Sequence, residues 1–338
     1  MKINFIVSKS MNHFFFVQNL AEWHYSCRKN FNRLYLKENE PLNKEEIKAL
    51  TDLRQLLQKY SFKPLENKKA DNVFNYLLRY EQLKDETEIL DDAERLRFIK
   101  TMKVFEPRFE KLWNQESENF SQVQSFLTKR FNQTEAQILT DLQTLFSPIA
   151  SKKEIEIILL LSAGDRGGGG GANNGPKTIT LECSSLKEKF VNYKLFVLWH
   201  EIAHLILKKY THKLCELLES NPTIKVASID AKRMDFGYIK ELFIFSIFTD
   251  IGFMTFKYFP IYNYKEYLLR SDEEWFRNER RIFPSYLIYL NGSFMEEKLR
   301  NRENIPAQEM AKAIVTNHLL TKEYYDQYGE LVTWFSYN

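Results

Sequence analysis

One short stretch limits what this chain can fold into more than any other part of its sequence. Residues 197–206 are apolar except for His200, Glu201 and His204. Residues four apart lie on the same face of a helix, so the two histidine side chains point the same way. Removing three polar side chains from water costs free energy unless they have partners there. The stretch therefore predicts a helix that is buried on most sides and carries a functional site.

The spacing of these three side chains is typical of a metal site. His200 and His204 can direct two imidazoles at one ion. Glu201 lies about 100° around the helix from His200, so its carboxylate stands beside the metal without binding it. A carboxylate in that place can take a proton from metal-activated water and pass it to a leaving amine. We therefore predict Zn²⁺ as the cofactor, with His200 and His204 as ligands and Glu201 as the catalytic general base.

Two strands are expected before this helix, separated by a cluster of glycines. Residues 154–162 are apolar and rich in branched side chains, which indicates a buried strand, and residues 178–183 alternate as a half-buried strand does. We expect the two to pair as a hairpin. Seven of the 11 glycines lie in the connection, five of them at Gly167–Gly171. Pro176 breaks the Walker register before Lys177, so the segment is a surface connection or a mobile rim of the metal cleft.

The segment Val197–Ile206 resembles the zincin metallopeptidases, which carry the same His-Glu-x-x-His pattern on their active-site helix. The expected strands are similar to the zincin layout, in which an edge strand above that helix pairs with an extended substrate. The resemblance covers residues 151–258 and implies hydrolysis of a peptide or protein substrate, with Glu201 as general base. We expect an α+β fold that is mostly α-helical, with a helical region at 1–150 and a zincin-like metallopeptidase region at 151–338.

The third zinc ligand separates the zincin subgroups. The metzincin pattern fails, because Leu207 stands where that subgroup has glycine. The gluzincin pattern takes a glutamate from a following helix, and Glu241 fits because it opens an apolar helix expected at 236–258. Asp235 is the rival, and a salt bridge to a lysine or arginine is the structural alternative for Glu241. Phe245 holds the position of the acidic residue that gluzincins usually carry four residues after the ligand.

A peptidase also needs a hydrogen-bond donor for the oxyanion that develops during hydrolysis. Tyr238, Tyr210 and His318 are candidates, and each is equally consistent with a packed or surface side chain. In the first 150 residues, Asn43 is expected to cap a helix, and Pro107 is expected to break or bend another.

Composition excludes several other classes. The net charge of +3 from 48 basic and 45 acidic residues gives no reason to expect nucleic acid or an anionic membrane as partner. Three distant cysteines form no disulfide framework, which favours a reducing, cytoplasmic compartment. The N-terminus lacks a signal-peptide pattern, and the most apolar stretch, 242–259, is shorter than the ~20 residues of a membrane-spanning helix.

The sequence thus favours a zinc metallopeptidase of gluzincin type. The alternative is a catalytically inactive zincin-like module that binds or regulates a partner through the helices of residues 1–150. Hydrolysis of a non-peptide amide is a third possibility. The sequence does not indicate the oligomeric state or the peptide sequence that is cleaved.

Overall fold

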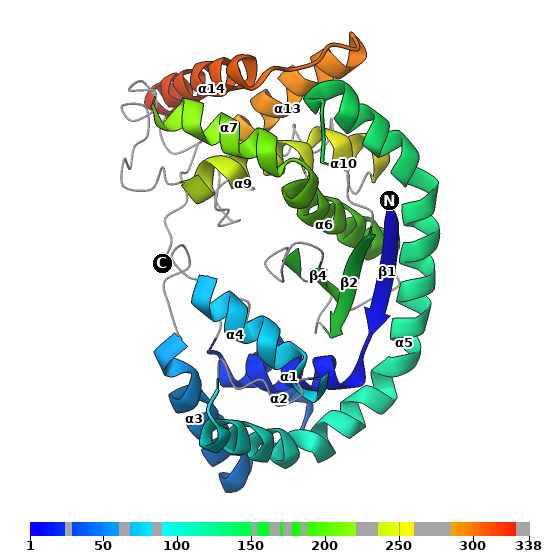
Figure 1. Ribbon diagram of the computed structural model, residues 1–338, viewed down its shortest axis with the longest axis vertical. Helices are drawn as coiled ribbons and strands as arrows, with labels where there is room; N and C mark the ends of the chain where they lie inside the picture. Colours follow the sequence, from blue (N-terminus) through cyan, green and yellow to red (C-terminus); the bar gives the residue numbers. More distant parts are fainter. Residues whose placement is uncertain are drawn as a thin grey trace. The chain divides into compact units, whose positions relative to one another are not determined.

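The computed structural model is mostly helical with one small sheet, so the expected α+β, mostly α-helical class is confirmed (Figure 1). Its residues group into two compact units, the first made of Met1–Thr128 and Glu154–Lys194, the second of Lys129–Lys153 and Leu195–Asn338. None of the helices described is long and apolar enough to cross a membrane. The structure describes residues 1–23, 29–60, 68–82, 90–150, 154–161, 170–171, 178–183, 188–220, 236–249, 251–259 and 285–328.

The sheet belongs to the first unit and has the strand order β1-β2-β4-β3. Strands β1 (Lys2–Val7), β2 (Glu154–Leu161) and β4 (Thr178–Cys183) run parallel, and only β3 (Gly170–Gly171) runs antiparallel to β4. The expected hairpin of β2 and β4 is therefore wrong. The connection at 162–177 is long enough for the crossover that parallel strands need, which takes a dozen or more residues.

Two further expectations about the sheet are wrong, one about the burial of β4 and one about the first 150 residues. Every residue of β4 is buried, although its alternating sequence predicted a half-buried strand. Thr178, Thr180 and Glu182 are 7%, 8% and 5% exposed, because strands inside a parallel sheet are covered on both faces. Strand β1 was not expected, because the first 150 residues were predicted to be helical.

Helix α1 (Lys9–Ala21) follows β1 directly and is fixed to β2 by the buried side chain of Asn12. Its Nδ2 donates to the carbonyl of Leu159 at 3.0 Å, and its Oδ1 accepts from the N–H of Leu161 at 2.7 Å. Strand β1 ends at Val7, opposite Leu159. The Asn12 carboxamide therefore continues the hydrogen-bond ladder beyond the end of the strand.

The other long helices of this unit test two expectations. Asn43 caps α3 as expected, because its Oδ1 accepts from the Glu46 N–H at 2.9 Å while Glu46 Oε2 accepts from the Asn43 N–H at 2.7 Å. Pro107 lies inside the 55-residue helix α5, so of the expected break or bend the break is wrong, and the bend stays a prediction. The neighbouring Phe105 and Phe109 are buried, and their packing offsets the hydrogen bond that proline omits. The helices are α2 (Lys29–Glu38), α3 (Lys44–Leu57), α4 (Lys68–Leu78) and α5 (Asp92–Phe146).

The second unit is helical and contains the end of α5 and most of α6. Helix α7 packs against α9 and α14, and α13 packs against α9, α10 and α14 (Figure 1). The metal-site helix was expected to run to Tyr210, and the apolar helix after it from 236 to 258. Instead α6 ends at Ile206, and the apolar segment divides into α9 and α10. The bounds are α6 (Glu188–Ile206), α7 (Lys208–Glu219), α9 (Phe236–Ile247), α10 (Phe253–Tyr258), α13 (Ser285–Arg300) and α14 (Ala307–Tyr328).

The end of α5 anchors the neighbouring helices of this unit. The ring of Phe131 stacks on that of Trp199 in α6, with centroids 5.1 Å apart. Asp141 is buried and accepts a hydrogen bond from Lys257 Nζ at 2.6 Å and another from the Tyr258 hydroxyl, both in α10. These contacts join α5 to α6 and α10.

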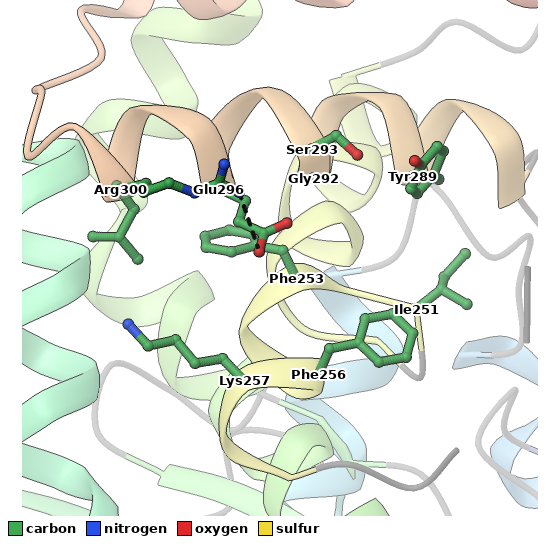
Figure 2. Close-up of a pocket in the computed structure, with 10 residues that line it drawn as sticks. Ile251, Phe253, Phe256, Lys257, Tyr289, Gly292, Ser293, Glu296 and Arg300 are labelled. Atoms are coloured by element: carbon green, nitrogen blue, oxygen red, sulfur yellow. Dashed lines mark ion pairs between the residues drawn. The ribbon is translucent and has the colours of Figure 1, made fainter. Parts of the chain in front are cut away.

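A cavity of about 450 Å³ lies between α10 and α13 (Figure 2). Ile251, Phe253 and Phe256 line it from the side of α10, and Tyr289 and Gly292 line it from α13. The missing side chain of Gly292 lets α13 approach the carbonyl oxygen of Ser246 closely, because a Cβ at residue 292 would lie 3.1 Å from that oxygen. The charged groups at its edge already have partners, since Lys257 pairs with Asp141 and Arg300 with Glu296.

Candidate metal centre

The structure brings the three predicted ligands together. His200 and His204 lie on α6 and are each 8% exposed, and Glu241 lies on α9. The two Nε2 atoms are 3.0 Å apart. Glu241 Oε2 lies 3.3 Å from His200 Nε2, and its Oε1 lies 3.2 Å from His204 Nε2. The carboxylate of Glu241 thus pairs with both histidines.

These spacings suit one tetrahedral ion. Nitrogen and oxygen ligands lie about 2.0–2.2 Å from zinc, so two of them at tetrahedral angles are about 3.4 Å apart. The three separations, 3.0, 3.2 and 3.3 Å, are slightly shorter than that value, and the ligand atoms all lie within 4.8 Å of one another. Among the described residues, the group offers two imidazoles and one carboxylate, a set of three protein ligands of the kind found in catalytic zinc sites.

The electrostatics of the group also suit a cation. Burial opposes the ionised form of Glu241, but the nearby His204 and the hydrogen bonds from both histidines hold the pKa of Glu241 well below its ordinary value. Burial likewise opposes a charge on His200, but the Glu241 hydrogen bond and the carboxylate of Glu201 raise the pKa of His200. The site therefore holds an ionised carboxylate and attracts positive charge.

Glu201, the predicted general base, is the residue after His200 on the same helix and is 8% exposed. Its neighbour Trp199 points into the core, where its ring stacks between those of Phe131 and Phe248. The helix thus fixes Glu201 next to the ligand pair on one side and packs firmly on the other. A carboxylate so placed can exchange a proton with a group near the metal.

The orientation of His200 is fixed by a contact that sequence analysis did not anticipate. Its Nδ1 lies 3.0 Å from the carbonyl oxygen of Phe248. A carbonyl only accepts hydrogen bonds, so Nδ1 carries the proton, and in the neutral ring the free lone pair is on Nε2, beside Glu241. Phe245, where gluzincins have an acidic residue, packs its ring 4.9 Å from that of His200. The only signal for this arrangement in the sequence was Gly252, which interrupts the apolar segment and stands immediately before α10.

Of the other candidates, the structure describes only the side chain of Tyr210. Asp235 lies outside the described residues, as do the side chains of Tyr238 and His318. The hydroxyl of Tyr210 donates to the carbonyl of Ile305 at 3.0 Å, so it is already engaged and is not a free oxyanion donor. Burial also raises the pKa of the Tyr210 hydroxyl above its ordinary value.

The glycine cluster is described only in part. Gly170 and Gly171 form β3, beside Leu181 and Thr180 of β4, and Gly167–Gly169 lie outside the described residues. The two interpretations of this segment, a surface connection or a mobile rim, therefore stay predictions.

Helix α6 carries the His-Glu-x-x-His segment, and α9 adds the carboxylate of Glu241 to its two histidines. No protein-family model, curated protein or solved structure matches this chain.

Proposed function

We propose that this protein is a zinc-dependent metallopeptidase of gluzincin type that hydrolyses peptide bonds in peptides or proteins. One observation carries the proposal: His200, His204 and Glu241 converge from two helices at ligand spacing, and Glu201 follows His200 directly on α6. The resemblance of the segment Val197–Ile206 to zincins supports the same proposed function.

Each residue has a defined task in the proposed reaction. His200, His204 and Glu241 would hold the ion, which when bound polarises a carbonyl and lowers the pKa of water to about 7. Glu201 accepts a proton from the attacking water and delivers it to the amine nitrogen as the peptide bond breaks. The rigid helix α6 fixes the base relative to two of the ligands, so that proton transfer needs no rearrangement of the backbone.

The first experiment separates metal binding from proton transfer. Glu201→Gln removes the base but none of the ligands, so it should retain about one zinc per chain and lose at least ~100-fold in peptide hydrolysis. Glu216→Gln on the exposed side of α7 is the matched control and should keep both properties. The measurements are zinc content of protein never exposed to chelators and cleavage of a peptide library.

Two results would contradict the proposal. Wild-type protein with less than ~0.2 zinc per chain would argue against a catalytic zinc site. Cleavage by Glu201→Gln at the wild-type rate would exclude the proposed base. A zinc-loaded wild-type protein that cleaves nothing in the library would instead favour the alternative of an inactive zincin-like binding module.

A further inference from the structure

We infer that the end of helix α9 is a positioning element for the metal centre: the Phe248 carbonyl, released from the helix by the turn to Gly252, holds His200 in the orientation that binds zinc. This inference rests on the proposed zinc site and concerns how its first ligand is oriented. The backbone carbonyl here does the work of the acidic side chain that is missing at Phe245.

The hydrogen bonds of the turn show why this carbonyl is available. In a continuing helix the N–H of residue 252 would bond to the carbonyl of Phe248, four residues earlier. Here the Gly252 N–H bonds instead to the carbonyl of Thr249, at 3.1 Å. The N–H of Phe248 still bonds to Ile244 at 2.8 Å, so the residue remains part of the helix. Its carbonyl is therefore firmly placed, and it accepts from His200 Nδ1 at 3.0 Å.

Two residues hold the turn in this form. The Thr249 hydroxyl donates to the carbonyl of Phe245 at 2.9 Å and accepts from the N–H of Ile251 at 3.2 Å, which closes the end of the helix. Gly252 permits the close return of the chain, because a Cβ there would lie 2.4 Å from the carbonyl oxygen of Ile247 and 2.6 Å from the Thr249 nitrogen. No side chain fits at residue 252 without moving the backbone next to Phe248.

The second histidine has no comparable support. His204 Nδ1 is buried and has no hydrogen-bond partner in the part of the chain that the structure describes. Metal-binding histidines usually donate their second ring nitrogen to an acceptor, which fixes the tautomer and makes the ring a better ligand. The Phe248 carbonyl thus provides this support to one ligand of the pair, so its displacement should weaken metal binding measurably.

The test measures zinc affinity without substrate, by competition with a chromophoric chelator. Gly252→Ala displaces the turn and should bind zinc about 10- to 100-fold more weakly than wild type. Thr249→Val removes the hydroxyl without a steric clash and should weaken binding about tenfold, which keeps the test valid if Gly252→Ala does not fold. Gly292→Ala is the control for the added methyl group. Its Cβ would lie 3.1 Å from the carbonyl oxygen of Ser246, and it would not clash with Ile247 or Thr249 as a Cβ at residue 252 would. It should bind zinc within about threefold of wild type.

A second measurement uses wild-type protein alone. In a nitrogen-15 NMR spectrum of the zinc-loaded protein, His200 should carry its proton on Nδ1, in slow exchange with water, and bind the metal through Nε2. A proton on Nε2 overturns the inference. Equal zinc affinity of Gly252→Ala and wild type, or an equal loss in Gly292→Ala, also overturns it while the proposed peptidase stands. A wild-type protein that binds no zinc removes both, and a zinc-bound Glu201→Gln that cleaves normally removes only the proposed mechanism.

Discussion

His13 should give the folded protein a specific sensitivity to acid. The side chain lies on α1, is 8% exposed, and stacks on the ring of Phe109 with centroids 4.7 Å apart and an interplanar angle of 15°. Burial lowers the pKa of His13 from 6.5 to about 4, although the nearby Glu110 acts in the opposite direction. In the unfolded chain the ring is in water and titrates at the ordinary value.

The sign and size of the effect follow from the two pKa values. Above pH 6.5 the ring is neutral in both states, and below pH 4 it is protonated in both. Between these limits the unfolded state binds a proton that the folded state does not, so the free energy of unfolding falls as the pH falls. The free energy of unfolding falls by about 1.36 kcal/mol for each pH unit below pH 6.5 and hardly changes above it. The loss between pH 7.5 and pH 4.5 is therefore about 2.5 kcal/mol.

Urea unfolding of wild type and His13→Phe at these two pH values isolates this contribution. Phenylalanine keeps a ring against Phe109 but does not titrate, and the neighbouring Lys9–Glu110 ion pair is common to both proteins. Wild type should lose about 2.5 kcal/mol more than the variant on acidification. An equal loss in the two proteins would show that the ring is not held neutral by its surroundings.

Two further substitutions test the packing of the first unit. Asn12→Ala leaves the Leu161 N–H and the Leu159 carbonyl without the amide that pairs with them, and should lower the free energy of unfolding by about 2–4 kcal/mol in urea titrations. Lys194→Met should raise it by about 1–3 kcal/mol at pH 7, because Lys194 Nζ is buried with no partner among the described residues and burial lowers its pKa. That gain should shrink as the pH rises toward 10.5, where the unfolded lysine also loses its proton. Unchanged stability of the first variant, or a loss in the second, would refute these accounts.

The parts of the site that sequence reasoning found depend on spacing within one helix. His200 and His204 had to share a face, and the neighbour of the first had to stand beside the metal. Glu241 was accessible to the same reasoning, because an acidic residue in so apolar a helix needs a positive partner. The structure places it against both histidines, while the identity of the ion stays a prediction.

The parts that sequence reasoning missed depend on contacts between distant segments. The direction of β4 depends on β2 and on the crossover between them, which no local pattern reveals. The end of α9 at Ile247 depends on the Thr249 hydroxyl and on close backbone contacts at Gly252, within a segment whose apolar side chains continue without a break. The orientation of His200 depends on that end, so it could not be read from the motif.

The contacts made by the end of α5 restrict where this chain can be shortened. A fragment that begins at residue 151 would leave Trp199, next to the first zinc-ligand candidate, without the ring of Phe131. It would also separate Lys257 from Asp141 and remove β1 from its place beside β2. The proposed peptidase region is therefore not a detachable fragment, and expression of an active truncation would have to include the segments that precede it.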